Sequence, residues 1–141
     1  MISSVNPYHI VIADDHEMFR EDLKKILLEK PHWEVVGEAN DGLALLDLLD
    51  RLVKSEVHPE LVITDISMPN LSGIEATRRI KKEHPELRVL IVSMHTEREY
   101  VYHAMAAGAQ GYLAKADLGN RLFSAIERIR HGGIYIYPLL V

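Results

Sequence analysis

Short apolar runs alternate along this chain with longer segments in which apolar residues recur every three or four positions. The apolar runs are rich in β-branched residues and end at polar or turn-forming residues, which is typical of β-strands. A nearly continuous apolar run suits a strand buried on both faces of a parallel sheet, because helices then cover both faces. Five segments fit this description: residues 9–13, 33–39, 61–64, 87–93 and 111–115.

The segments between these runs have the apolar spacing of amphipathic helices. Capping and turn residues set their expected ends: Pro31 stops the first helix, Asn40 caps the second, and Asp117 caps the last. Gly108 follows the fourth helix, where a left-handed backbone is favourable. The spacing predicts helices over residues 17–29, 43–53, 74–83, 98–107 and 118–129.

A strand followed by a helix therefore occurs five times. Right-handed crossovers between such units give a parallel sheet with helices on both sides. The predicted fold class is α/β, a doubly wound (βα)5 domain built on a five-stranded parallel sheet. Beyond the last helix, Tyr135 and Tyr137 alternate with Ile134 and Ile136, which fits either a short extra strand or a linker.

Composition narrows the classes of function. The 141 residues include 16 Lys and Arg against 21 Asp and Glu, a net charge of −5, and the basic residues are scattered, which disfavours direct nucleic-acid binding. The absence of Cys excludes disulfides and thiolate metal sites, and the eight His residues, which lack ligand spacing with Cys or Glu, are interpreted as solvated. With neither a signal-peptide pattern nor a membrane-length apolar run, we expect a cytoplasmic protein without membrane contact.

Polar residues that can carry chemistry follow four of the strands. Asp14 and Asp15 come after the first strand and Asp65 after the third. Ser93 ends the fourth strand and Lys115 the fifth. Because the carboxyl ends of parallel strands meet at the edge where ligands bind, we expect these side chains to converge.

Three carboxylates this close need a cation, and oxygen ligands open to water suit Mg²⁺. A carboxylate there can also act as a nucleophile and form an aspartyl-phosphate. Mg²⁺, the Lys115 ammonium and the Ser93 hydroxyl would then stabilise the phosphoryl oxygens.

Each of these residues also has a structural interpretation when taken alone. Asp14 and Asp15 suit the N-terminus of a helix. Asp65 suits a turn before Pro69, and Lys115 suits an exposed surface. Their joint occurrence at successive strand ends is what favours a phosphoryl site.

The polar residues belong to a series of short motifs in chain order: Asp14-Asp15, Asp65-x-x-Met68-Pro69, Ser93 and Gly111-Tyr112-x-x-Lys115. Together these motifs resemble the receiver domain of bacterial two-component response regulators, over residues 9–131. This resemblance implies the flavodoxin-like strand order 2-1-3-4-5. A narrower similarity to the NarL/FixJ group, in which a linker and a LuxR-type helix-turn-helix follow the receiver, is carried by Ala13-Asp14-Asp15-His16, Gly111-Tyr112-Leu113-Ala114-Lys115 and Gly132-Gly133-x-Tyr135.

The resemblance implies a role for each residue of the acidic site. Asp65 would accept a phosphoryl group from a phosphohistidine on a sensor kinase. Asp15 would bind Mg²⁺ directly, Asp14 largely through water, and the main-chain carbonyl of Ser67 would complete the protein's share of the ligands.

It also implies how the signal leaves the site. Ser93 and Lys115 would hold the phosphoryl oxygens, and Ser93 would be drawn toward the new charge. Space would then open for the ring of Tyr112, the aromatic switch, to turn inward. Ser67 and His95 flank the path of the water that hydrolyses the phosphoaspartate, so we hypothesise that they tune its lifetime.

The chain departs from the family after Lys115. Many receivers have a proline there with a cis peptide bond, whereas this chain has Ala116. A cis bond before a residue other than proline costs ~3 kcal/mol, so we expect a trans bond and a different entry to the last helix.

The resemblance also implies domain limits and partners. Residues 1–131 would form the receiver, and residues 132–141 would begin an interdomain linker or a C-terminal tail. The partners would be a sensor histidine kinase and a second copy, bound through the face of the fourth helix, fifth strand and fifth helix. DNA would be contacted only through a C-terminal domain outside this chain.

The protein would be a phosphoacceptor that assists its own phosphorylation and dephosphorylation, not an enzyme. The alternative is a stand-alone receiver that acts by protein–protein interaction.

Three other classes of protein fit this sequence less well than a receiver. A flavodoxin-type FMN binder shares the strand order but needs a glycine- and hydroxyl-rich phosphate loop where this chain has Asp14-Asp15-His16-Glu17. A phosphohydrolase with an aspartyl-phosphate needs a second Asp two residues after its nucleophile, a spacing absent here. A pseudo-receiver used only for docking is disfavoured because every charged position of the site is filled.

Overall fold

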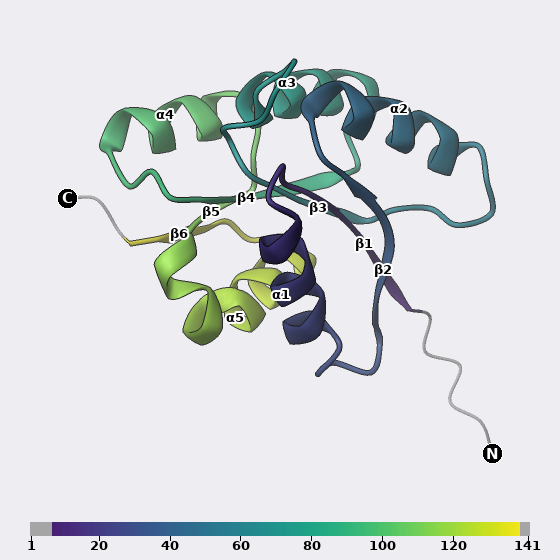
Figure 1. The fold of residues 1–141 in the computed structure, drawn as a ribbon, viewed down its shortest axis with the longest axis horizontal. Coiled ribbons are helices and arrows are strands. Elements are labelled where there is room, and N and C mark those ends of the chain that lie inside the picture. Colours follow the sequence, from purple (N-terminus) through teal and green to yellow (C-terminus); the bar gives the residue numbers. More distant parts are fainter. Residues whose placement is uncertain (1–6, 139–141) are drawn as a thin grey trace.

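Six parallel strands form a single sheet in the order β2-β1-β3-β4-β5-β6 (Figure 1). The computed structural model describes residues 7–138, so the N-terminal stretch 1–6 and the last three residues of the expected linker lie outside it. The predicted order 2-1-3-4-5 is confirmed, and β6 extends the sheet by one strand. The strands are β1 (Tyr8–Ala13), β2 (Trp33–Ala39), β3 (Leu61–Thr64), β4 (Arg88–Ser93), β5 (Gly111–Ala114) and β6 (Tyr135–Tyr137).

Five helices cover the two faces of the sheet (Figure 1). They are α1 (Glu17–Leu27), α2 (Gly42–Val53), α3 (Gly73–Glu83), α4 (Arg98–Ala106) and α5 (Leu118–Arg130). Helices α1 and α5 pack on one face, and α2, α3 and α4 pack on the other. The predicted doubly wound arrangement is therefore confirmed.

Alternation along the strands divides the core into two apolar clusters. In β3, Leu61 and Ile63 contact the α1/α5 side, whereas Val62 contacts the α2/α3/α4 side. All four residues of β3 are buried, because both faces of this central strand are covered. The apolar run before Asp65 thus reflects burial on both faces, as the sequence predicted.

The helix ends agree with the sequence only in part. Gly108 has a φ of 109° just after α4, as expected for a left-handed C′ residue. The expected Asn40 cap is wrong by one residue: Asp41 is the N-cap of α2, and its side chain accepts a hydrogen bond from the amide of Ala44. Asp117 stands at the N-cap position of α5 but makes no side-chain cap bond. A short 3-10 turn, Lys115–Asp117, precedes α5 instead, and the Lys115–Ala116 bond is trans.

Strand β6 resolves the alternative left open for residues 134–137. It pairs with β5, with Gly111 opposite Tyr135 and Tyr112 opposite Ile136. Tyr135 and Tyr137 pack on the α1/α5 side and Ile136 packs on the other. The alternation therefore came from a strand, and the outer edge of β5 is covered. Within residues 7–138, none of the helices has the length and apolar character needed to cross a membrane.

Candidate functional site

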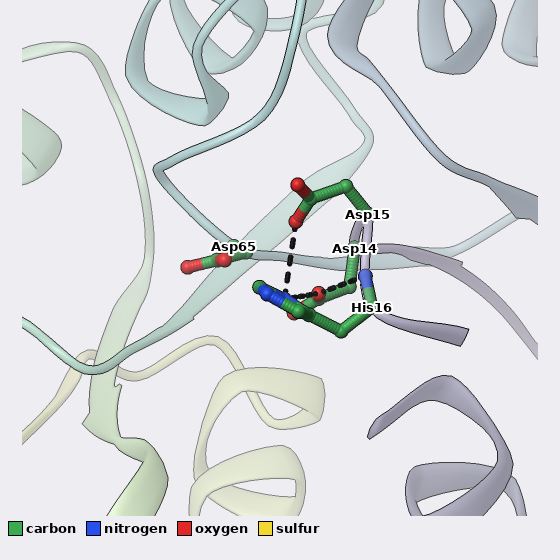
Figure 2. Close-up of side chains that lie close together, drawn as sticks. All are labelled: Asp14, Asp15, His16 and Asp65. Carbon is green, nitrogen blue, oxygen red and sulfur yellow. Dashed lines mark hydrogen bonds and ion pairs between the residues drawn. The ribbon is translucent and has the colours of Figure 1, made fainter. Parts of the chain in front are cut away.

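Acidic side chains from two strand ends meet at the carboxyl edge of the sheet (Figure 2). Asp14 and Asp15 follow β1, and Asp65 follows the adjacent strand β3. Ligand atoms of these three residues and of His16 all lie within 4.8 Å of one another. Asp14 is 2% exposed and Asp65 is 5% exposed, whereas Asp15 and His16 are open to solvent. The site is therefore half buried, with its open side formed by Asp15 and His16.

Lys115, which follows β5, brings a positive charge to the two buried carboxylates. Its Nζ lies 2.8 Å from Oδ2 of Asp14 and 3.4 Å from Oδ2 of Asp65. The same nitrogen stands 4.1 Å from the ring centre of Phe19 on α1. This contact with the aromatic face holds the ammonium in place between the strands.

Local backbone bonds fix Asp65 at the end of β3. The amide of Ile66 donates a 2.7 Å bond to Oδ1 of Asp65. Burial raises the pKa of Asp65, the Lys115 ammonium opposes this effect, and the negative charge of Asp14 reinforces it. Gly73 at the start of α3 packs against the main chain of Asp65, where a Cβ would lie 1.8 Å from the Asp65 carbonyl oxygen.

Ser93 and His95 form a hydrogen-bonded turn beside the acids. Ser93 is fully buried, and its Oγ accepts a 3.0 Å bond from the amide of His95. Nε2 of His95 lies 3.2 Å from Oγ of Ser67. The His95 ring also stacks on the ring of Tyr100 of α4, with 4.0 Å between the ring centres. The two residues predicted to tune the lifetime are thus in contact.

The ring of Tyr112 is fully buried in the core under α4. Its hydroxyl donates a 2.6 Å bond to the main-chain carbonyl of His95, and burial raises its pKa. The sequence-based hypothesis has this ring turn inward when the site is charged. The ring already lies inside in this structure, because the His95 carbonyl offers its hydroxyl a partner there.

His16 is the site residue to which the sequence interpretation gave no role. Its Nδ1 lies 2.9 Å from Oδ1 of Asp14 and 3.1 Å from Oδ1 of Asp15. The side chain of His16 is 67% exposed, in agreement with the interpretation of the histidines as solvated, but its ring also contacts these two acids. Adjacency to an Asp pair at the N-terminus of a helix was the signal that could have identified His16.

A hollow of about 400 Å³ opens beside the Lys115 side of the site. It is lined mainly by apolar and small side chains. These residues are Phe19, Ser93, Met94, Thr96, Ala114, Lys115 and Ala116.

The sequence pattern that defines the response regulator receiver domain matches residues 10–127. The chain belongs to this family. The match covers both strand ends that carry the acids, together with Ser93, Lys115 and most of α5. It selects the receiver from among the classes that the sequence left open.

Curated relatives of this chain are regulatory proteins. The transcriptional regulatory protein DegU of Brevibacillus brevis is 38% identical over 133 residues, covering 94% of this chain and 54% of the relative. The oxygen regulatory protein NreC of Staphylococcus carnosus is 35% identical, covering 92% of this chain and 58% of the relative. The receiver thus spans little more than half the length of these relatives.

Solved structures agree with the receiver assignment. A two-component response regulator of the LuxR family from Aurantimonas sp. SI85-9A1 superposes with a TM-score of 0.86 and 32% identity, covering 94% of this chain and 91% of that one. The signal receiver domain of a putative NarL response regulator from Mycobacterium tuberculosis gives a TM-score of 0.82 and 30% identity, with coverage of 91% and 99%. This chain is therefore a receiver domain of the NarL/LuxR type, the phosphorylation-switched part of two-component regulators.

Proposed function

We propose that Asp65 is the phosphoacceptor and that its donor is the phosphohistidine of a sensor kinase. A carboxylate oxygen of Asp65 forms a bond to phosphorus as the phosphorus–nitrogen bond breaks, and the histidine ring of the donor leaves with the electron pair. The observation that carries this proposal is the convergence of a buried Asp65, a second buried carboxylate and one ammonium group at the carboxyl edge.

The acidic site fits Mg²⁺ by its donor set. Three carboxylates face one ammonium group, so their charge is only partly balanced within the described residues, and hard oxygens open to water are the ligands that Mg²⁺ prefers. Asp15 and Asp65 would bind the ion directly, Asp14 largely through water, and the Ser67 carbonyl would complete the set. Bound there, Mg²⁺ neutralises charge that develops on the phosphoryl oxygens.

Lys115 and Ser93 would hold the phosphoryl group once it is on Asp65. The Lys115 ammonium already lies 3.4 Å from Asp65, so it needs little movement to meet a phosphoryl oxygen. The Ser93 oxygen accepts the His95 amide in this structure and its hydroxyl also hydrogen-bonds Tyr112, so it would turn from Tyr112 to donate to the phosphoryl group. A preorganised donor such as Lys115 stabilises charge without rearrangement during the reaction.

The contacts of His95 give the switch a route from Ser93 to Tyr112. Ser93 holds the amide of His95, and the carbonyl of the same residue holds the Tyr112 hydroxyl. When Ser93 turns toward the phosphoryl group, the main chain of His95 loses one support and the acceptor of Tyr112 shifts. The packing of α4 on β5 then changes, since Tyr112 lies under α4.

We propose the partners from the receiver family, because this chain covers 54% of DegU and 58% of NreC. A kinase would supply the phosphoryl group, and DNA would be bound only through a separate domain. One solved relative is described as two dimers of RcsB bound to two parallel DNAs, with 26% identity and a TM-score of 0.84. A second copy of this chain would bind the predicted face of α4, β5 and α5, and β6 borders that face because it pairs with the edge of β5.

Intact mass after treatment with acetyl phosphate and Mg²⁺ tests the acceptor. We expect the wild type to gain the mass of one phosphoryl group and Asp65→Asn to gain none. Asp47→Asn, at an exposed acid on α2, is the matched control and should behave as the wild type. An equal gain in Asp65→Asn would place the acceptor elsewhere.

The bridge between Ser67 and His95 is the basis for the lifetime proposal. The two side chains lie 3.2 Å apart, and the pair would restrict the approach of water to a phosphoryl group on Asp65. We expect His95→Ala to change the rate at which phosphate is released, while Tyr100→Phe, which keeps the ring that stacks on His95, leaves it unchanged. Identical release rates in wild type and His95→Ala would discard the role of His95.

A further inference from the structure

We propose that Arg20 is a positioning residue for the metal-binding acids Asp14 and Asp15, and that Glu38 holds Arg20 in the geometry that this role requires. Arg20 lies on α1, and Glu38 lies on β2, the strand next to β1. This role rests on the cation site of the proposed function.

The main chain of Asp14 is held from two directions. Its amide donates a 3.1 Å bond to the carbonyl of Ala39 at the end of β2. Its carbonyl accepts a 2.5 Å bond from Nη1 of Arg20. Because a peptide unit is planar, fixing this oxygen also fixes the direction in which the chain enters Asp15. Arg20 therefore acts on both acids through the peptide unit that joins them.

Asp15 depends on this main-chain support more than Asp14 does. The Asp14 side chain is buried, and the ammonium of Lys115 lies 2.8 Å from its Oδ2. Asp15 is open to solvent and contacts the ring of His16, which is exposed as well. Because core packing does not restrict the Asp15 side chain, the position of its main chain limits where its carboxylate can lie.

Glu38 sets the direction of the Arg20 guanidinium. Nε of Arg20 donates a 3.1 Å bond to Oε1 of Glu38, while Nη1 of the same planar group reaches the Asp14 carbonyl. The guanidinium presents these two donors in a fixed relation, so the bond at one end orients the other. Lys24 donates a 2.6 Å bond to Oε2 of Glu38, and hydrogen bonds from Lys24 and Arg20 lower the pKa of Glu38. Glu38 therefore stays charged at neutral pH and keeps Arg20 aligned.

The charge of Arg20 by itself would have the opposite effect on a cation. A guanidinium near the acids repels a divalent ion and weakens its binding. Holding the acids in place strengthens binding, because less ordering of the ligands is left to occur when the ion arrives. The two effects therefore predict opposite changes in Mg²⁺ affinity when Arg20 loses its charge.

Titration with Mg²⁺, followed through the amide resonances next to the acids, tests the positioning role. Arg20→Lys keeps the charge and loses the planar fork, and we expect it to bind Mg²⁺ about tenfold more weakly than the wild type. Arg20→Gln should also bind more weakly, although it removes a repulsive charge. Arg51→Lys, in an exposed ion pair with Asp47 on α2, is the matched control and should bind as the wild type.

A second variant reaches the same connection from β2. Glu38→Gln should weaken Mg²⁺ binding, because Arg20 loses the charged acceptor that orients it. The double variant of Arg20→Lys and Glu38→Gln should bind no more weakly than Arg20→Lys alone, since both changes break one connection. Fully additive losses would show that Glu38 acts through its charge and not through Arg20.

Phosphorylation by acetyl phosphate gives a readout that a general loss of structure would not reproduce. In Arg20→Lys the Mg²⁺ concentration for half-maximal rate should rise about tenfold, while the rate at saturating Mg²⁺ stays at the wild-type level. A variant that is only less well folded would react to a smaller extent at every Mg²⁺ concentration.

Wild-type Mg²⁺ affinity in Arg20→Lys, or tighter binding by Arg20→Gln, would overturn the positioning role. Asp15→Asn separates that result from a failure of the cation site. Loss of Mg²⁺ binding in Asp15→Asn together with wild-type binding in Arg20→Lys overturns only the role of Arg20 and leaves the proposed function standing. Unchanged Mg²⁺ binding in Asp15→Asn overturns the cation site itself.

Discussion

Asp65 experiences two opposing effects, each of which has a visible source. Removal from water disfavours its charged form, and the ammonium of Lys115 favours it. Asp14 shares that ammonium at a shorter distance, so Lys115 serves two buried carboxylates at once. Any further positive charge at this site would therefore stabilise the charged form of Asp65.

Replacing Asp65 should stabilise the metal-free protein at neutral pH. Folding raises the pKa of Asp65, so the folded chain holds this proton more tightly than the unfolded chain does. The stability that this gives is fully present below the unfolded pKa and is lost as the pH rises through the folded pKa. Asp65→Asn keeps the shape without the charge. We expect its free energy of unfolding in urea to exceed that of the wild type at pH 7. The difference should shrink as the pH is lowered toward the usual pKa range of a carboxyl group. A mutant less stable than wild type at pH 7 would contradict this.

Replacing Lys115 should have the opposite effect. Lys115→Gln leaves two buried carboxylates without their cation, and breaking a buried pair costs roughly 3–5 kcal/mol. We expect a loss of this size in urea unfolding without Mg²⁺ and a partial recovery when Mg²⁺ is added. The exposed Lys25→Gln on α1 is the control, and an equally small loss in both variants would show that Lys115 is not needed to balance the acids.

The loop between β3 and α3 positions Asp65 through close packing of main chains. Gly73 lies against Asp65 so tightly that a Cβ there would overlap the Asp65 carbonyl oxygen. The amide of Gly73 also donates a 2.8 Å bond to the carbonyl of Ile66. The start of α3 therefore sets the position of the residue that follows β3.

Two glycine substitutions separate packing from helix propensity. Gly73→Ala should lower the free energy of unfolding by several kcal/mol or displace Asp65, because the clash is with backbone atoms that cannot rotate away. Gly119→Ala, in α5, has no atom within 4 Å of the added Cβ and should stabilise the protein by up to about 1 kcal/mol. Urea unfolding of both variants measures this, and similar effects in the two would refute the packing argument.

Elements that follow from chain periodicity were predictable, and those set by contacts distant in sequence were not. The four strands that end at acids, at Ser93 or at Lys115 could be predicted because burial on both faces requires a nearly continuous apolar run. Asn40 and Asp41 are both good capping residues, so only the backbone could show which one caps α2. The inward ring of Tyr112 depends on a carbonyl seventeen residues away, and no local pattern records such a partner.

At the scale of the whole molecule, binding at one edge is linked to the stability of both core clusters. The acids follow strands that contribute to each cluster, so an ion that binds only the folded chain stabilises the entire domain. Such linkage is measurable without any phosphoryl donor. It also tests the cation site independently of the reaction.

Mg²⁺ should raise the melting temperature of the wild type, and the gain should grow with the logarithm of the Mg²⁺ concentration above the dissociation constant. At 100 times the dissociation constant, linkage gives about 2.7 kcal/mol. We expect this gain to vanish in Asp15→Asn and to persist in His84→Ala. His84 belongs to a second carboxylate and imidazole group with Asp50 and Glu83, so it tests whether that group takes the ion instead. Loss of the gain in His84→Ala alone would move the site to that group.

Strand β6 connects the edge of the sheet, through β5 and β4, to the strand that carries the acidic site. Ile136 is the ladder partner of Tyr112, and Ser93 is paired with Ala114 in the same sheet. Two strand-to-strand steps therefore separate the turn formed by Ser93 and His95 from the edge strand β6. If that turn responds to a charge on Asp65, as proposed above, the response can reach the sheet edge through neighbouring strands as well as through α4.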